Sequence, residues 1–445
     1  MGAGPSGMSQ NIPAAPAVAV AGLWHLGTVT AACLASAGVS TLGYDPDPAV
    51  ITGLSSGRPP LFEPGLETLV RNGLQNGRLR FAADPAAVAD AEIIWVTWDT
   101  PVDEDDHADV EFVIAQVERL FPYLQDDALV LVSSQLPVGS VSRLERAYAT
   151  MRPSGRATFA SSPENLRLGK AIDAFTNPDR VILGVRSQRD AERIRALLAP
   201  LSPLIDVVRV ESAEMTKHAL NAFLATSVAF INEVARLGEL TGADAREVER
   251  ALKSDVRIGP RAYVRPGGAY AGGTLARDVS YLIAQGEERG CSMPLFRGVR
   301  ESNDLHREWA YNALVRLLGP LSGHLIAVLG LTYKPGTDTL RRSPAVDLCQ
   351  RLVTTGAGVI AYDPVVKALP PDLSGTISLA NTAGDALRSA SAVVIGTEWP
   401  EFRTLTADAF VGDRRGVLVL DPGGFLASAL QADPRIRYTV VGTPT

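Results

Sequence analysis

The sequence has few cysteines and no long apolar run. Its three cysteines, Cys33, Cys291 and Cys349, lie far apart among 445 residues, without the paired spacing of a metal site or a disulfide framework. A reducing, cytoplasmic setting without a bound metal is therefore expected. No stretch is apolar enough to span a membrane, so we expect no membrane partner.

An excess of positive charge is also missing. The formal net charge of -7 argues against binding to nucleic acid or acidic lipid, which leaves a small soluble molecule as the expected partner. Residues 1–16 are rich in Gly, Pro, Ala and Ser but have no positively charged segment before an apolar core. They are interpreted as a flexible leader and not as a signal peptide.

Short apolar runs alternate with helical patterns in two parts of the chain, which is typical of parallel sheets covered on both faces. The first series comprises residues 18–20, 93–96, 129–132 and 181–183, and the second comprises residues 325–329, 358–362, 392–395 and 417–420. At this length two or three domains are expected. The fold class predicted is α/β, with two Rossmann-like doubly wound domains joined by a central helical region.

The central region, from Ser212 to about Asp304, is predicted to be largely helical. One face carries residues at spacings of three and four that are apolar except for one serine, namely Leu220, Phe223, Ser227, Phe230, Val234 and Leu237. Such a face buries well against a neighbour. We expect it to act both as a spine between the domains and as a homodimer interface.

A glycine-rich turn follows the first predicted strand. It reads Gly22-Leu23-Trp24-His25-Leu26-Gly27, leads into a helix predicted over residues 28–37, and is followed by a second strand that ends at Asp45. This layout is typical of a dinucleotide site with an acid for the ribose diol, and the acid favours NAD over NADP. The middle glycine is replaced by Trp24, so the motif is weak by itself. His25 is expected on a pocket wall or at the surface.

Further segments together resemble the UDP-glucose/GDP-mannose dehydrogenase family. They lie, in order, at residues 62–66, 100–101 with 109, 134–140, 162–167, 213–223, 255–260, 329–338, 341, 343–344 and 397–402. The resemblance covers almost the whole chain beyond the leader. It implies an NAD-binding domain over residues 17–210, a central helical dimerisation region over 211–305 and a C-terminal substrate-binding domain over 306–445.

The resemblance also assigns site residues. Lys217 and Asn221, one helical turn apart, match a catalytic pair, while Asp278 and Glu164 match acids that order water or accept a proton. The cofactor-binding residues implied are Gly22, Leu23, Trp24, Leu26, Gly27, Asp45, Thr100, Pro101, Ser134, Gln135 and Arg341. The substrate-binding residues implied are Glu164, Leu166, Lys217, Asn221, Arg257, Tyr270, Gly272 and Lys334. Arg257 would reach the partner copy's substrate.

The chain departs from the family pattern at the nucleophile. Family members oxidise a sugar CH2OH twice through a thioester on cysteine, but Thr274 occupies the cysteine position here. A threonine hydroxyl is a poor substitute for a thiolate. The pocket differs also at Gln135, Leu168, Thr339 and Arg342. We therefore expect no thioester step.

The leading hypothesis is an NAD-dependent enzyme acting on a sugar hydroxyl of a nucleotide-sugar or nucleoside-like substrate. Without the thioester, the reaction is either a transient oxidation followed by dehydration or epimerisation and re-reduction, or a two-electron oxidation. The competing enzyme hypothesis is a UDP-sugar 6-dehydrogenase that forms a uronate, with Thr274 tolerated in the catalytic set or a different nucleophile recruited. A hypothesis of another class is an inactive sugar-nucleotide binding protein.

Overall fold

The computed structural model of the chain describes residues 17–101, 108–164, 166, 168–201, 204–271, 273–371 and 373–444. The chain forms two compact units, one ending at Lys217 and the other beginning at His218. The division falls inside one long helix, α8 (Val210–Thr241). Each unit is described by itself below.

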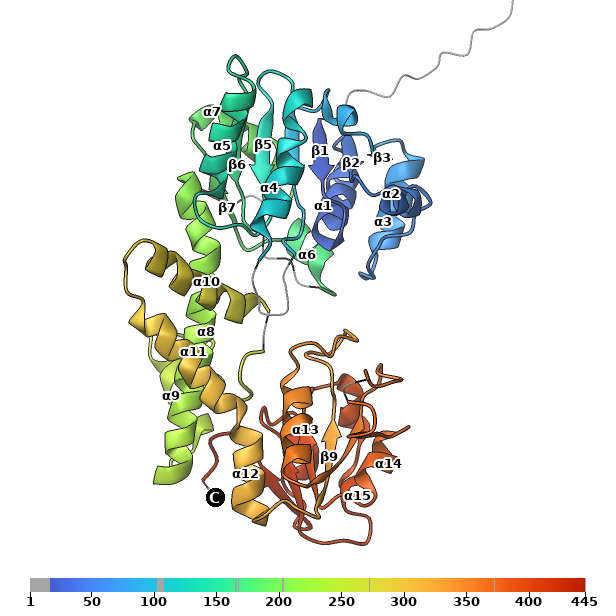
Figure 1. The fold of residues 1–445 in the computed structure, drawn as a ribbon, viewed down its shortest axis with the longest axis vertical. Coiled ribbons are helices and arrows are strands. Elements are labelled where there is room, and N and C mark those ends of the chain that lie inside the picture. The colour runs from blue at the N-terminus through green and yellow to red at the C-terminus, as the bar shows by residue number, and fades with distance from the viewer. Residues whose placement is uncertain are drawn as a thin grey trace, which may run out of the picture. The chain divides into compact units, whose positions relative to one another are not determined.

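The N-terminal unit is built on an eight-stranded sheet in the order β3-β2-β1-β4-β5-β6-β7-β8, parallel except where β6 meets β7 (Figure 1). The strands are β1 (Val18–Ala21), β2 (Thr41–Tyr44), β3 (Leu79–Ala82), β4 (Ile93–Val96), β5 (Leu129–Val132), β6 (Thr158–Ser161), β7 (Val181–Gly184) and β8 (Ile205–Val208). Strands β1, β4 and β5 are buried along their whole length, which explains why they are continuous apolar runs.

Helices cover both faces of this sheet. Alternate strand residues enter two separate cores, with Val18 and Val20 on one face and Ala19 and Ala21 on the other. Helices α1 (His25–Ser36), α3 (Leu66–Gln75), α6 (Ala171–Thr176) and α7 (Gln188–Leu198) pack on the first face. Helices α4 (Val110–Glu118) and α5 (Ser140–Met151) pack on the second, and α2 (Pro48–Ser55) follows β2.

The C-terminal unit contains a six-stranded parallel sheet in the order β11-β10-β9-β12-β13-β14. Its strands are β9 (Leu325–Leu329), β10 (Gly358–Tyr362), β11 (Ser378–Leu379), β12 (Ala392–Ile395), β13 (Val417–Leu420) and β14 (Ile436–Thr439). The helices between them are α13 (Pro344–Thr354), α14 (Ala383–Leu387), α15 (Ala407–Val411) and α16 (Ala427–Leu430). This is the second Rossmann-like layout that the sequence predicted.

The helical region predicted between the two sheets is present. It comprises α8, α9 (Ala245–Ser254), α10 (Thr274–Glu288) and α11 (Pro294–Arg307), and a further helix that was not predicted, α12 (Trp309–Leu318), follows it before β9. The small residues Ala222, Ala225 and Ala229 of α8 are buried. The larger side chains of the predicted apolar face are not, since Phe223 is 68% exposed and Leu237 is 61% exposed. Among the described residues of a single chain, nothing therefore covers Phe223 and Leu237 fully.

The predicted fold class is confirmed, and one boundary is corrected. Helix α1 begins at His25, directly after Trp24, and not at Thr28, because the turn closes through the Thr28 amide, which donates to the Trp24 carbonyl. Over the described ranges no helix has the length and apolar character needed to cross a bilayer. The same residues contain no group of three or more His, Cys, Asp and Glu side chains arranged to hold a metal.

Candidate active site

The turn after β1 is shaped by two glycines. Gly22 has φ +98°, and a Cβ there would lie 2.6 Å from the backbone nitrogen of Trp98. A Cβ on Gly27 would lie 1.7 Å from the carbonyl oxygen of Gly22. Both positions therefore require glycine, and the close packing brings the N-terminus of α1 against the end of β1. This geometry fits a dinucleotide phosphate.

Asp45 lies where the sequence predicts the ribose-binding acid. It follows β2 and accepts hydrogen bonds from the backbone amide of Leu23 (2.8 Å) and from the amide of Asp47 (3.0 Å). Its carboxylate is only partly buried, so it keeps acceptor capacity for a ligand. Trp24, in the middle-glycine position, is 48% exposed, so its indole is not packed inside the turn.

The other predicted cofactor residues of this unit gather beyond β4 and β5. The Thr100 hydroxyl donates to the carbonyl of Gln135 (2.7 Å), which ties the two loops together next to Pro101. The hydroxyl of Ser134 is buried and has no hydrogen-bond partner among the described residues, as expected of a group that meets a ligand. Leu26, on α1, is largely buried.

The cofactor turn is linked to the segment that follows β6 by a residue that the sequence reasoning missed. The buried carboxylate of Glu63 accepts hydrogen bonds from His25 (2.9 Å), from the Gly169 amide (2.7 Å) and from the Ala171 amide (2.8 Å). Burial raises the pKa of Glu63, but these three donors outweigh it and lower the pKa below its usual value. His25 thus lies on the wall of the turn and holds this carboxylate.

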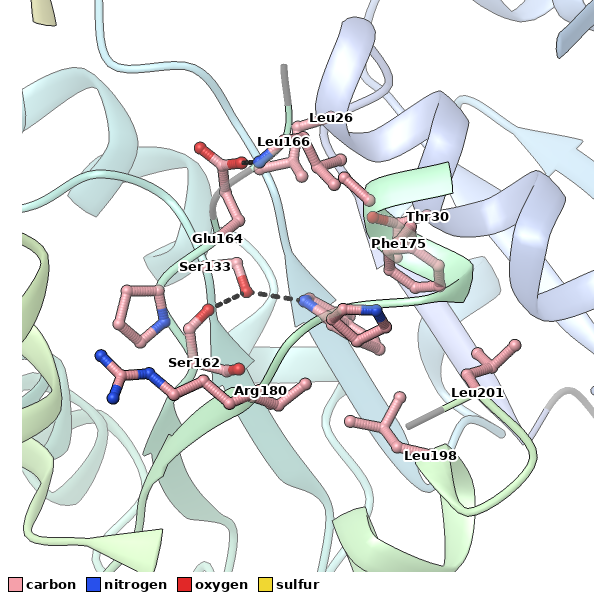
Figure 2. A pocket seen from close by; sticks show the side chains of 15 residues that line it. Leu26, Thr30, Ser133, Ser162, Glu164, Leu166, Phe175, Arg180, Leu198 and Leu201 are labelled. Atoms are coloured by element: carbon pink, nitrogen blue, oxygen red, sulfur yellow. Dashed lines mark hydrogen bonds between the residues drawn. The ribbon is translucent and has the colours of Figure 1, made fainter. Parts of the chain in front are cut away.

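The structure brings Glu164 and Lys217 together. The Lys217 ammonium donates to the backbone carbonyl of Glu164, and Nζ lies 3.9 Å from Oε1 of its carboxylate. The carboxylate itself accepts from the amide of Leu166, as Figure 2 shows. Lys217 has a side chain only 12% exposed, so the interpretation of a solvated surface lysine is excluded. Leu168, which the resemblance suggests as the replacement of an acid, is 39% exposed.

Asn221 and Asp278 also meet, within the C-terminal unit. The Asn221 amide donates to Oδ2 of Asp278, and His218 Nδ1 lies 3.1 Å from Oδ1. The His218 ring stacks on Tyr281, with the ring centroids 4.6 Å apart. Asp278 and His218 are 1% and 3% exposed. The sequence reasoning missed His218 and Tyr281, although His218 lies inside the motif that supplied Lys217 and Asn221.

Thr274 is the first residue of α10 and is exposed, four residues before Asp278 on the same helix. The cysteines do not replace it, because Cys33 and Cys349 are buried and Cys291 lies beyond the far end of α10. At 1.5 Å per residue, that end is about 20 Å from Thr274 along the helix axis. None of the three cysteines therefore lies at the end of α10 that begins with Thr274.

The glycine-rich loop before α10 is held from two helices by residues that the sequence reasoning also missed. Asn232 accepts from the Gly267 amide (3.0 Å), and Asn303 accepts from the Tyr270 amide (3.0 Å). His306 donates to the Gly267 carbonyl (2.7 Å), and burial lowers its pKa to about 4, so it is neutral near pH 7. Burial likewise raises the pKa of Tyr270 to about 12. The predicted Gly272 lies outside the described residues.

Three predicted residues lie at exposed positions. Arg257 has a side chain 85% exposed and pairs with Asp255 (2.7 Å). Lys334 lies in the loop after β9 with Nζ 5.2 Å from the ring centroid of Tyr333, and Arg341 precedes α13. The cross-subunit role of Arg257 and the substrate and cofactor roles of Lys334 and Arg341 stay predictions.

Comparison with known proteins matches the whole layout. Residues 16–202, 211–305 and 327–427 match the NAD binding, central and UDP binding domain models of the UDP-glucose/GDP-mannose dehydrogenase family. A UDP-glucose 6-dehydrogenase of Pseudomonas aeruginosa is 36% identical over 440 residues, covering 96% of this chain and 97% of its own. The chain belongs to the UDP-glucose/GDP-mannose dehydrogenase family. It is thus an oxidoreductase-family enzyme with NAD as cofactor.

Other relatives agree with this assignment. A UDP-glucose 6-dehydrogenase of Rhizobium meliloti is 34% identical, covering 96% of this chain and 99% of its own. Among solved structures, a UDP-glucose dehydrogenase of Pyrobaculum islandicum superposes with a TM-score of 0.84 at 30% identity and covers 98% of this chain and 100% of its own. The names of these relatives fit the alternative of a UDP-sugar 6-dehydrogenase better than they fit the redox-neutral hypothesis.

Proposed function

We propose that this family member uses NAD to oxidise the primary hydroxyl of a UDP-sugar, and that the reaction proceeds without a thioester. The full-length similarity to UDP-glucose 6-dehydrogenases supports the UDP-sugar and the position of oxidation. The observation that carries the finer proposal is Thr274 at the N-terminus of α10, where the family pattern has its thiol. The first product is then the aldehyde.

Different residues of the chain have different roles in this oxidation step. The Lys217 ammonium, held beside Glu164, is a cation that stabilises a developing alkoxide. The proton of the sugar hydroxyl passes to a carboxylate, for which Asp278 and Glu164 are the candidates. Asn221 and His218 fix the carboxylate of Asp278 by bonding one oxygen each. NAD, when bound, supplies the hydride acceptor.

The decisive experiment counts NADH per sugar. The purified chain is incubated with UDP-glucose and NAD, with absorbance reporting NADH and mass spectrometry reporting the product. One NADH and a loss of two hydrogens are expected. Two NADH with a gain of one oxygen and a loss of two hydrogens would instead establish the uronate-forming 6-dehydrogenase, the second candidate, which the relatives' names favour.

Thr274→Cys tests the same point from the chain itself. Restoring the thiol is expected to raise the ratio from one NADH per sugar toward two, with uronate as the product. Thr274→Ser is the matched control, because it keeps a hydroxyl at the same place, and its ratio should stay at one. A wild-type reaction with no net NADH and either a loss of water or an isomer would support the redox-neutral cycle. UDP-glucose binding without any turnover would support an inactive binding protein.

We further propose that two copies pair through the exposed face of α8. Phe223, Phe230 and Leu237 are each at least half exposed on this helix, and unpaired faces of this kind mark interaction surfaces. Light scattering after gel filtration is expected to give a dimer. The double variant Phe223→Glu/Phe230→Glu should give a monomer, whereas Phe62→Glu, at a residue 84% exposed outside α8, should not. A monomeric wild-type chain would overturn the proposal.

A further inference from the structure

A cavity that the proposed chemistry does not use lies inside the N-terminal unit. Its lining, drawn in Figure 2, includes Trp95 of β4, residues just after the carboxyl ends of β5 and β6, and residues of α1, α6 and the end of α7. Its volume is about 90 Å³. An apolar cavity of about 150 Å³ binds benzene, so this volume is of the order that one small ring needs.

The walls of the cavity are mainly apolar and aromatic. The rings of Trp95 and Phe175 lie 5.9 Å apart and tilted by 42°, while Leu198 and Leu201 close the far end in Figure 2. Trp95 is 5% exposed and Leu198 is 4% exposed, so these groups belong to the interior. This part of the lining suits a hydrocarbon ring, while the charged side chains of the lining, Glu164 and Arg180, lie at the other side in Figure 2.

Most of the polar atoms of the wall are already bonded within the protein. The Trp95 indole donates to the Ser133 hydroxyl (2.8 Å), which donates to the Ser162 carbonyl (2.5 Å). The Ser162 hydroxyl donates to the carbonyl of Ile182 (3.2 Å). Because these polar atoms already have partners, a ligand would gain few hydrogen bonds at this wall.

Thr30 is different. It lies in the middle of α1, is 0% exposed and lines the cavity, yet its hydroxyl has no hydrogen-bond partner among the described residues. A buried hydroxyl without a partner is costly, and native proteins almost always satisfy such a group with protein, water or ligand. A ligand that brings one hydrogen-bonding atom to Thr30 would remove this cost.

The cavity shares part of its wall with the catalytic segment. Pro163, Glu164 and Leu166 form part of its wall. The Glu164 carboxylate, however, is turned toward the Leu166 amide and not into the cavity (Figure 2). A molecule in the cavity would therefore contact the backbone that carries Glu164.

We propose that this cavity binds a small, uncharged, mainly apolar ligand of about the size of a phenol ring, with a single hydroxyl group facing Thr30. The ring lies against Trp95 and Phe175, and the hydroxyl group makes the bond that Thr30 lacks. Because the ligand packs against Pro163 and Leu166, its binding also restrains the backbone of Glu164. The binding step does not depend on the proposed reaction.

Binding is measured on the full chain by calorimetry with p-cresol and with toluene, without NAD or sugar nucleotide. Both probes are expected to bind and to raise the melting temperature, p-cresol about tenfold more tightly because it reaches Thr30. Thr30→Val keeps the shape and removes the hydroxyl, so it should abolish the p-cresol advantage and leave toluene binding unchanged. Thr52→Val, a change of the same kind on exposed α2, is the control and should leave both affinities unchanged.

A second variant fills the space. Ala174→Leu adds volume at the wall and is expected to weaken both probes at least tenfold while the chain still melts cooperatively. The proposal is overturned if neither probe binds at millimolar concentration, or if Ala174→Leu leaves both affinities unchanged. It is also overturned if p-cresol keeps its advantage in Thr30→Val. All these readouts are independent of turnover, so an inactive enzyme would not obscure them.

Discussion

The two units build the same strand-to-turn connection, once after β1 and once after β9. Gly22 has φ +98° and donates to the carbonyl of Tyr44 (2.9 Å), and Gly330 has φ +90° and donates to the carbonyl of Tyr362 (2.7 Å). In each unit a Cβ on the glycine would lie 2.6 Å from a backbone nitrogen of the neighbouring strand's loop. The turn thus approaches the neighbouring loop equally closely in both units, and glycine is required at both positions.

The acids that follow the second strands also correspond. Asp45 accepts from the amide of Leu23 (2.8 Å), and Asp363 accepts from the amide of Leu331 (2.7 Å). Both are preceded by tyrosine and followed by proline. The backbone of the turn is therefore anchored by the same carboxylate contact in both units.

The surroundings of the two acids differ. Asp363 is 1% exposed, and its Oδ2 also accepts from the Thr332 amide (3.1 Å) and the Trp399 indole (3.0 Å), whereas Asp45 is half-buried. Helix α1 begins at once after the first turn, but α13 begins only at Pro344 after the second. The first turn has an open acid and a helix N-terminus for a ligand. The second has become part of the scaffold, so fingerprint residues alone do not identify a cofactor site.

The largest loss of stability is expected from Asp363→Asn. The amide would present donor hydrogens to donors already packed around it, so the free energy of unfolding should fall by about 3 kcal/mol. Asp45→Asn is the matched change and should cost under about 1 kcal/mol, because Asp45 reaches solvent. Scanning calorimetry of the two variants checks this. Equal shifts would show that the two acids are equivalent and would break the comparison.

A smaller loss of stability is expected when alanine replaces the glycine of either turn. Gly22→Ala and Gly330→Ala should each destabilise their unit by roughly 2–3 kcal/mol, because the methyl group meets backbone at 2.6 Å in a left-handed conformation. Gly77→Ala is the control, since Gly77 has φ +72° but nothing within 4 Å of its Cβ. Its cost should be about 1 kcal/mol. Thermal melts that rank Gly77→Ala with the other two would refute the close-approach argument.

The periodicity of the sequence was sufficient to predict both sheets and the helical region. Strands buried on both faces are continuous apolar runs, so residues 93–96 and 129–132 were recognisable without a structure. That Glu164 and Lys217 belong to one site could also be expected, but only from the family resemblance, and their hydrogen bond was not predicted. Short-range geometry likewise placed Lys217 and Asn221 one turn apart on a single helix.

The contacts that hold the site could not be predicted. Glu63 reaches the Gly169 amide, 106 positions away, and His218 reaches Asp278, 60 positions away. Hydrophobic spacing predicts which face of an element is buried, not which polar groups meet across the fold. The unpaired hydroxyl of Thr30 carries no sequence signal at all, because most helical threonines bond within their own helix.

Asp45→Arg tests whether the open acid of the first turn selects the cofactor. Removing the carboxylate and adding a cation should weaken NAD binding about tenfold and reduce the preference for NAD over NADP. Calorimetric titration with each dinucleotide measures both effects. Asp363→Arg is not a usable control because Asp363 is buried, so Asp47→Arg, at an exposed neighbouring acid, serves instead. If Asp45→Arg keeps the preference for NAD over NADP, Asp45 does not bind the ribose.

Trp24→Gly is expected to have the smallest effect of the changes considered. It tests whether Trp24 is a further difference between the turn after β1 and the turn after β9. Trp24 precedes α1, is half exposed, and occupies the place where a glycine lets a dinucleotide phosphate approach the backbone. Removing the indole should tighten NAD binding a few-fold and cost under about 1 kcal/mol of stability, because the side chain buries little. Trp24→Ala should bind NAD with an affinity between those of the wild-type chain and Trp24→Gly. Weaker NAD binding in both variants would mean that the indole contacts the cofactor, and the first turn would then differ from the second by a recognition residue as well as by an open acid.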